Sequence, residues 1–245
     1  MEVSFKNNKG QVLQGVVHEP KKYTTAIVFL HGFPGAMGGT GKRVCTGLAK
    51  KGFLCLRFTF SGSDTSEGKF ADKLMSQEVK DVKYAINFLE KNYKYKQLVL
   101  VGHSTGAIDA ALYAHKDKRV SKLVLLGMIN ELDTGVNYDF TARQIKSFWE
   151  KKHIVYNSPG DWVHKKKLKK AFYDEFFTLS VKKSLKKYKK PVLIVHGSND
   201  QAIPVKDAKE LAKEIKARFV LIKGAGHNFK PKTKELISRL SSFSR

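Results

Sequence analysis

The chain has 245 residues, 42% of them hydrophobic, and a formal net charge of +24, which predicts one soluble domain with room for an insertion. Its two cysteines exclude a disulfide framework, and no histidine and cysteine cluster has zinc-site spacing, so no metal or cofactor is expected. No apolar run reaches the roughly 20 residues of a membrane span, and the first ten residues lack a signal-peptide core, which favours a cytoplasmic protein.

Short apolar runs alternate with helical segments along most of the chain. Residues 2–6 and 11–18 predict a hairpin around Asn7 to Gly10, because asparagine and glycine tolerate positive φ. Further strands are predicted at 26–30, 53–58, 97–101, 120–127, 191–196 and 218–222, and helices at 40–51, 76–93, 107–115, 206–216 and 232–243. This alternation predicts an α/β fold: a mostly parallel, eight-stranded sheet with helices on both faces.

A serine stands at the end of the predicted strand 97–101. The residues Gly102-His103-Ser104-Thr105-Gly106 fit G-x-S-x-G and lie between that strand and a helical segment. A tight strand-to-helix turn strains the serine backbone, and glycines on both sides avoid side-chain clashes. The pattern predicts Ser104 as a nucleophile, with Gly102 and Gly106 shaping the turn.

Two later loops supply the partners that a nucleophilic serine needs. Asp200 follows the predicted strand 191–196, and His227 follows the predicted strand 218–222, so both lie at carboxyl ends of sheet strands. The order Ser, Asp, His is the one expected for this type of turn. We therefore predict a catalytic triad in which His227 is the general base and Asp200 orients it.

An oxyanion hole requires backbone donors near the serine. The expected donors are the N–H groups of Thr105 and Phe33, and Pro34 has no N–H to offer. His103 and His31 are interpreted as structural residues. Asp109, one helical turn past the serine, is interpreted as a polar contact of its helix rather than a catalytic acid.

The segment from 130 to 190 interrupts the alternation and is too long for a simple crossover. We expect a core of residues 1–129 and 191–245 and an inserted lid or cap at 130–190. Within it, 153–155 and 161–163 are predicted to pair as a hairpin around 157–160. From 141 to 190 the insert has 15 lysines and arginines against four acidic residues.

The excess of basic residues is almost entirely lysine, since 39 of the 46 are lysines. A protein that reads nucleic-acid sequence usually depends more on arginine, so no specific nucleic acid is expected as a partner. A solvated lysine surface is the simpler interpretation. The alternative is a protein that binds an anionic surface through the basic insert.

Four stretches resemble the α/β-hydrolase superfamily: His31-Gly32-Phe33, Gly102 to Gly106, His196 to Asp200 and Gly226-His227. Arg57-Phe58-Thr59-Phe60, residues 66–70 and the single insert are similar to small microbial carboxylesterases, including the feruloyl or cinnamoyl esterase type. The resemblance implies hydrolysis of a small-molecule ester, with a short-chain or aromatic acyl group, through an acyl-enzyme and without a cofactor. Thioesterase, monoacylglycerol lipase-like and peptidase activities stay open. Asp64 stands where the resemblance leads us to expect a glycine.

Overall fold

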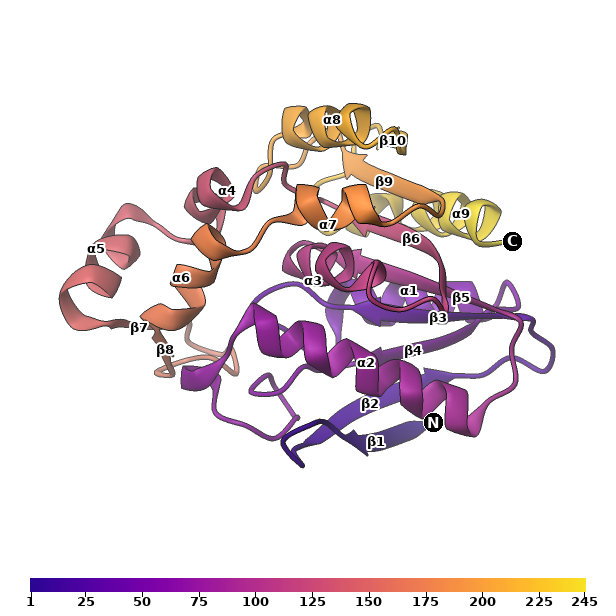
Figure 1. Ribbon diagram of the computed structural model, residues 1–245, viewed down its shortest axis with the longest axis horizontal. Coiled ribbons are helices and arrows are strands. Elements are labelled where there is room, and N and C mark those ends of the chain that lie inside the picture. Colours follow the sequence, from indigo (N-terminus) through magenta and orange to yellow (C-terminus); the bar gives the residue numbers. More distant parts are fainter.

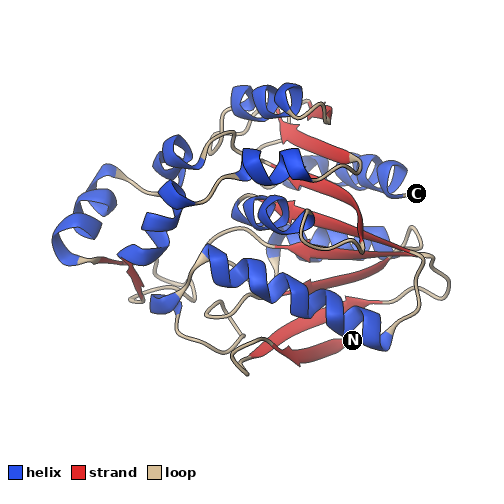
Figure 2. Cartoon of the chain, in the orientation of Figure 1, coloured by secondary structure: helices blue, strands red, loops and turns tan.

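The computed structural model describes all 245 residues as a central sheet covered on both faces by helices (Figures 1 and 2). Eight strands form the sheet: β1 (Glu2–Lys6), β2 (Val12–His18), β3 (Thr25–Leu30), β4 (Leu54–Phe58), β5 (Gln97–His103), β6 (Val120–Leu126), β9 (Val192–Gly197) and β10 (Arg218–Ile222). Their order is β1-β2-β4-β3-β5-β6-β9-β10. β2 pairs antiparallel with both β1 and β4, and all other neighbours are parallel, which confirms the predicted sheet.

Two apolar layers enclose the sheet, one on each face. The helices of the core are α1 (Gly39–Ala49), α2 (Met75–Asn92), α3 (Thr105–Ala114), α7 (Val181–Lys187), α8 (Val205–Glu214) and α9 (Thr233–Ser244). α1 and α9 contribute their buried side chains to one layer, and α2, α3, α7 and α8 contribute theirs to the other. The apolar side chains that recur every three or four residues in 76–93 form the buried face of α2 and pack into this second layer, as the sequence predicts.

Residues 130–190 fold into helices and a small sheet of their own. These elements are α4 (Leu132–Asp139), α5 (Ala142–Lys151), β7 (His153–Val155), β8 (Lys167–Lys169), α6 (Lys170–Thr178) and the core helix α7. All but α7 project beyond the edge at which the parallel strands end, on the left in Figure 1. Two short 3-10 turns, η1 (Phe70–Asp72) and η2 (Lys230–Lys232), complete the chain. No helix is long and apolar enough to cross a membrane.

The hairpin predicted within the insert has the wrong partner. Strand 153–155 pairs antiparallel with Lys167–Lys169, not with 161–163, and Ile154 stands opposite Leu168. Both of these side chains are buried, so the register places the apolar residue of each strand in the core. Residues 161–163 form a turn instead, which directs Trp162 toward the main domain.

Candidate active site

Ser104 occupies a strained turn between β5 and α3. Its φ is +56° and its ψ is −127°, so the backbone lies outside the regions that a side chain prefers. A Cβ on Gly102 would lie 2.1 Å from the carbonyl oxygen of Gly106, and one on Gly106 would lie 2.4 Å from that of His31. Only glycine fits at either position, as a tight turn between a strand and a helix requires.

The loop that follows β3 passes directly against the serine. A Cβ on Gly32 would lie 2.8 Å from Cβ of Ser104 and 3.4 Å from its Oγ. The next peptide N–H belongs to Phe33, and the N–H of Thr105 opens helix α3, where no preceding turn supplies an acceptor. The structure thus brings the segments with both predicted oxyanion donors beside Ser104.

His31 holds the peptide group that carries the Phe33 N–H. The backbone N–H of Phe60 donates to Nε2 of His31 at 3.2 Å, so Nδ1 bears the ring proton and donates to the carbonyl of Gly32 at 2.9 Å. Burial, reinforced by the positive charge of Lys73, lowers the pKa of His31 to about 3. The neutral ring that this arrangement requires is therefore maintained, and the predicted structural role is confirmed.

His227 and Asp200 form a close pair. Nδ1 of His227 lies 2.8 Å from Oδ2 of Asp200, whose side chain is fully buried. Oδ1 of Asp200 accepts the N–H groups of Ala202 and Ile203 at 2.9 and 3.0 Å. Burial alone would raise the pKa of Asp200, but hydrogen bonds from His196, His227 and Ile203 hold the pKa well below its usual range. The carboxylate is thus ionised and fixed in place.

His196 is a residue of the site that sequence reasoning missed. It lies in β9, four residues before Asp200, and its side chain is completely buried. Its Nε2 is 2.9 Å from the carbonyl oxygen of Ile203 and 3.2 Å from Oδ2 of Asp200. The sequence does show a histidine at the end of the strand that precedes the Asp200 loop. Its distance from Asp200 along the chain does not reveal that the carbonyl of Ile203 orients its ring.

His103 supports the loop that carries His227. Its Nε2 lies 2.9 Å from the carbonyl oxygen of His227, and the two ring centroids are 4.9 Å apart. Burial, followed by the positive charge of His227, lowers the pKa of His103 to about 4, so the ring is neutral and donates through Nε2. The predicted structural role of His103 is confirmed.

A pocket of about 490 Å³ opens at the serine. Ser104, His227, Phe33 and Trp162 are among the residues that line it. Nε1 of Trp162 donates to the carbonyl of Gly35 at 2.5 Å, so a residue of the insert is attached to the loop after β3. Ser104 and His227 therefore face one cavity whose wall the insert helps to build.

Two acidic side chains have surroundings that the sequence does not predict. Asp109 is fully buried and neither of its oxygens has a hydrogen-bond partner, so the predicted polar contact is wrong. Burial, with the nearby charge of Glu78, raises the pKa of Asp109 well above its ordinary value. Asp139, at the end of α4, was not singled out by its sequence. Burial raises the pKa of Asp139 to about 6, and the charge of His227 opposes this rise.

No group of three or more histidine, cysteine, aspartate or glutamate side chains in the chain is arranged to hold a metal ion.

Comparisons with known proteins identify the family of this chain. A family model described as "Serine aminopeptidase, S33" matches residues 21–176, and one described as "TAP-like protein" matches residues 177–239. No curated protein matches the chain.

Several solved structures share the fold over nearly their whole length. Est1E from Butyrivibrio proteoclasticus, solved with ferulic acid bound, has a TM-score of 0.80 at 23% identity and covers 98% of this chain and 97% of its own. The Pyrococcus furiosus esterase Pf2001 has a TM-score of 0.72 at 21% identity, with 99% and 90% covered. A protein from Agrobacterium vitis S4 has a TM-score of 0.80 at 17% identity, with 100% of this chain and 99% of its own covered. At these identities the likeness establishes the fold.

Proposed function

Because the chain belongs to the serine aminopeptidase S33 family of α/β-hydrolases, we propose that it cleaves carboxylic esters through an acyl-enzyme on Ser104. One observation carries the proposal. Ser104 stands on a strained turn and faces the same pocket as His227, whose Nδ1 is bonded to the buried carboxylate of Asp200. A serine, a base and an orienting acid in this arrangement are the parts that nucleophilic acyl transfer requires.

The proposed reaction begins with proton transfer from Ser104 to Nε2 of His227. Oγ attacks the ester carbonyl, and Asp200 stabilises the imidazolium through the Nδ1 proton. The carbonyl oxygen becomes an oxyanion and accepts hydrogen bonds from the N–H groups of Phe33 and Thr105. His227 then gives the proton to the departing alkoxide, and an ester bond to Ser104 remains. Water, activated by the same histidine, releases the acid and restores Ser104.

The resting geometry is compatible with this sequence of steps. Oγ of Ser104 makes no hydrogen bond within the chain, whereas His227 is already bonded to Asp200. Hydrogen bonds between nucleophile and base are often long or poorly aligned before substrate binds, and they tighten in the complex. The α3 N-terminus behind Ser104 adds a favourable field for the developing negative charge.

The pocket supports a small ester with an apolar acyl group as substrate. Phe33 and Trp162 line it, and the ring of Phe33 packs 4.9 Å from that of Phe172 in the insert. We assign residues 130–190 the role of a cap that shapes the acyl side of the site. Of the two acyl classes proposed, short-chain and aromatic, the ferulic acid bound to Est1E, a protein of the same fold, supports the aromatic one.

The direct test replaces Ser104 with alanine. Hydrolysis of p-nitrophenyl acetate and butyrate should fall by at least about 10³-fold, and a fluorophosphonate should label the wild-type chain on Ser104 and leave the variant unlabelled. Ser242→Ala is the matched control, because Ser242 is exposed on α9. Turnover by Ser104→Ala that equals the wild-type rate would refute the proposal.

Peptidase activity is the second candidate, because the family model that matches residues 21–176 is described as an aminopeptidase. An aminopeptidase needs an anionic partner for the α-ammonium of its substrate. Asp139 lies near enough to His227 for the charge of His227 to lower its pKa, and its carboxylate has no hydrogen bond or ion pair in the chain. Alanine p-nitroanilide assayed beside p-nitrophenyl butyrate separates the two activities. Thioester and monoacylglycerol substrates in the same panel cover the thioesterase and lipase-like alternatives.

A further inference from the structure

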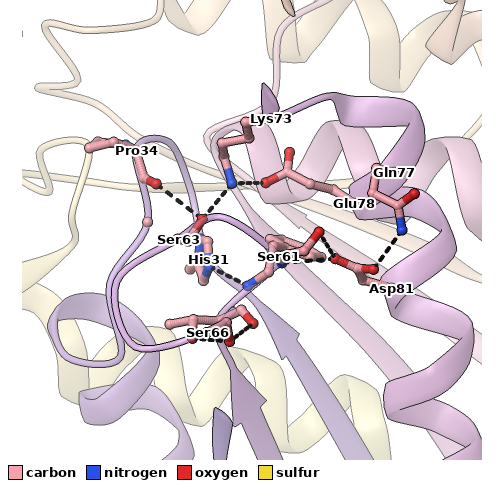
Figure 3. A network of polar contacts seen from close by, with 12 residues as sticks. His31, Pro34, Ser61, Ser63, Ser66, Lys73, Gln77, Glu78 and Asp81 are labelled. Carbon is pink, nitrogen blue, oxygen red and sulfur yellow. Dashed lines mark hydrogen bonds and ion pairs between the residues drawn. The ribbon is translucent and has the colours of Figure 1, made fainter. Parts of the chain in front are cut away.

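The loop that follows β4, residues 59–73, fastens the oxyanion loop along its length. We call residues 59–73 the brace and residues 31–37 the oxyanion loop. Figure 3 shows the polar network between the brace, the oxyanion loop and α2. Three hydrogen bonds join the two loops: Phe60 N–H to His31 Nε2 at 3.2 Å, Ser63 Oγ to Pro34 O at 3.4 Å, and Met37 N–H to Asp64 Oδ2 at 2.9 Å.

The contacts of Asp64 explain why an aspartate stands where a glycine was expected. Its φ is +44°, in the region that glycine tolerates best. The side chain that a glycine lacks is the acceptor for the Met37 N–H. The strain at Asp64 is thus offset by a link between the brace and the oxyanion loop.

Lys73 lies at the centre of the network, and its side chain is only 1% exposed. Its Nζ donates to Oγ of Ser63 and forms an ion pair with Glu78 of α2. An ammonium group has donors and no acceptor, so it occupies a lone pair of the Ser63 hydroxyl. The single proton of that hydroxyl is then directed to the carbonyl of Pro34.

The position of Pro34 matters for the oxyanion hole. Phe33 carries the proposed donor N–H, and Pro34 directly after it has no N–H of its own. The carbonyl of Pro34 is therefore the one backbone group of this residue by which a hydrogen bond can hold the loop. His31 fixes the Gly32 carbonyl on the preceding side of Phe33. With Ser63 on Pro34, the backbone is held on both sides of the donor.

A contribution to stability alone does not account for this arrangement. Lys73 and Glu78 are each only 3% exposed, and removing charges from water is costly. Burial raises the pKa of Glu78, and the charge of Lys73 opposes that rise. An apolar core of the same volume is often as stable as a buried ion pair or more so.

We propose that Lys73 and Ser63 are positioning residues that hold Pro34 and so aim the N–H of Phe33 at the substrate oxyanion. This inference rests on the proposed acyl-transfer function. Neither residue touches the substrate in this role, and Lys73 acts through Ser63.

The test compares three variants with the wild-type chain. Ser63→Ala removes the link and leaves both charges. Lys73→Met combined with Glu78→Met removes the link and also both members of the ion pair, so no buried charge is left unpaired. Lys69→Met is the matched control, because Lys69 is an exposed lysine of the same brace.

The readouts are kcat and KM for p-nitrophenyl butyrate and Ki for a trifluoromethyl ketone, whose tetrahedral adduct uses the oxyanion hole. Loss of a whole oxyanion donor costs about 10²–10³ in rate. A displaced donor should therefore lower kcat about tenfold, and raise Ki about tenfold, with KM within about twofold of wild type. Lys69→Met should match wild type in all three.

Two results overturn the inference alone. In the first, Ser63→Ala and the double variant both have the kcat and Ki of wild type. In the second, these variants differ from wild type only in KM. Both leave the proposed function standing, because the wild-type chain is active in them. A wild-type chain that turns over no ester and takes up no fluorophosphonate on Ser104 overturns the proposed function and this inference together.

Discussion

Replacing Asp139 with asparagine should stabilise the protein at neutral and alkaline pH. The carboxylate of Asp139 accepts no hydrogen bond and forms no ion pair. The charge of His227 is the only one that lowers the pKa of Asp139, and burial outweighs it. Burial therefore raises the pKa of Asp139 from its ordinary 3.8 to about 6. Above pH 6 the folded state must hold an unpaired charge that the unfolded state exposes to water.

The sign and size of the effect follow from linkage. Between pH 4 and 6 the folded state binds more protons at Asp139 than the unfolded state does, so stability falls as pH rises through this window. A shift of about two units corresponds to about 3 kcal/mol at most, and access of water to this partly exposed residue reduces it to about 2 kcal/mol. Asparagine resembles the protonated acid, so the gain should vanish near pH 4.

Urea unfolding of wild type and Asp139→Asn at pH 4.5, 6 and 8 measures the difference directly. Asp133→Asn is the control, because Asp133 is an exposed acid of the same helix and should give no gain at pH 8. The reasoning is refuted if Asp139→Asn gains nothing at pH 8, or gains the same amount at all three pH values.

Three further substitutions test the site. Asp200→Asn should lower kcat for p-nitrophenyl butyrate by about 10³–10⁴ with little change in KM, because the base loses its orientation; a loss below tenfold contradicts the assigned role. Trp162→Phe removes the donor to Gly35 and should lower the free energy of unfolding by about 1 kcal/mol in urea, and an unchanged midpoint would show that this bond is dispensable. Gly102→Ala places a Cβ 2.1 Å from the carbonyl oxygen of Gly106 and should cost more than about 3 kcal/mol, which a thermal melt within a degree of wild type would disprove.

The features that the sequence makes predictable arise from local backbone requirements. Glycines at 102 and 106 are needed because a carbonyl lies within 2.4 Å of where either Cβ would be. A steric requirement of this kind produces a recognisable pattern of residues close together in the sequence. Asp200 and His227 are also visible, because each follows an apolar strand of a parallel sheet whose strand ends meet at one edge.

Contacts between distant segments escaped prediction. Trp162 donates to a carbonyl 127 residues away, and nothing near it in the chain indicates that acceptor. The strand 153–155 was predicted to pair with 161–163, but it pairs with the more distant Lys167–Lys169, where Leu168 is buried opposite Ile154. Lys73 is one of 39 lysines, so its burial beside Glu78 has no local signature.

The ring of Phe33 packs against the insert. Its centroid lies 4.9 Å from that of Phe172, 6.0 Å from Tyr156 and 6.2 Å from Phe140, and all three belong to residues 130–190. Aromatic pairs of this kind contribute about 0.5–1.5 kcal/mol each beyond the burial of their area. The backbone of the same residue carries the proposed oxyanion donor.

Substitutions at these three aromatic positions should therefore lower kcat for every ester, whether or not they also change which ester is preferred.

Residues of the pocket that do not contact Phe33 offer a way to separate the effect on kcat from the effect on substrate preference. Thr40 lines the pocket from the first turn of α1, and its side chain contacts the backbone of Asn228. Changing Thr40 should alter KM between acyl groups and leave kcat for the preferred ester within a few-fold. The prediction is contradicted if a Thr40 variant loses kcat to the same extent for all esters and its Ki for the trifluoromethyl ketone rises by the same factor. The oxyanion loop would then depend on Thr40 as well.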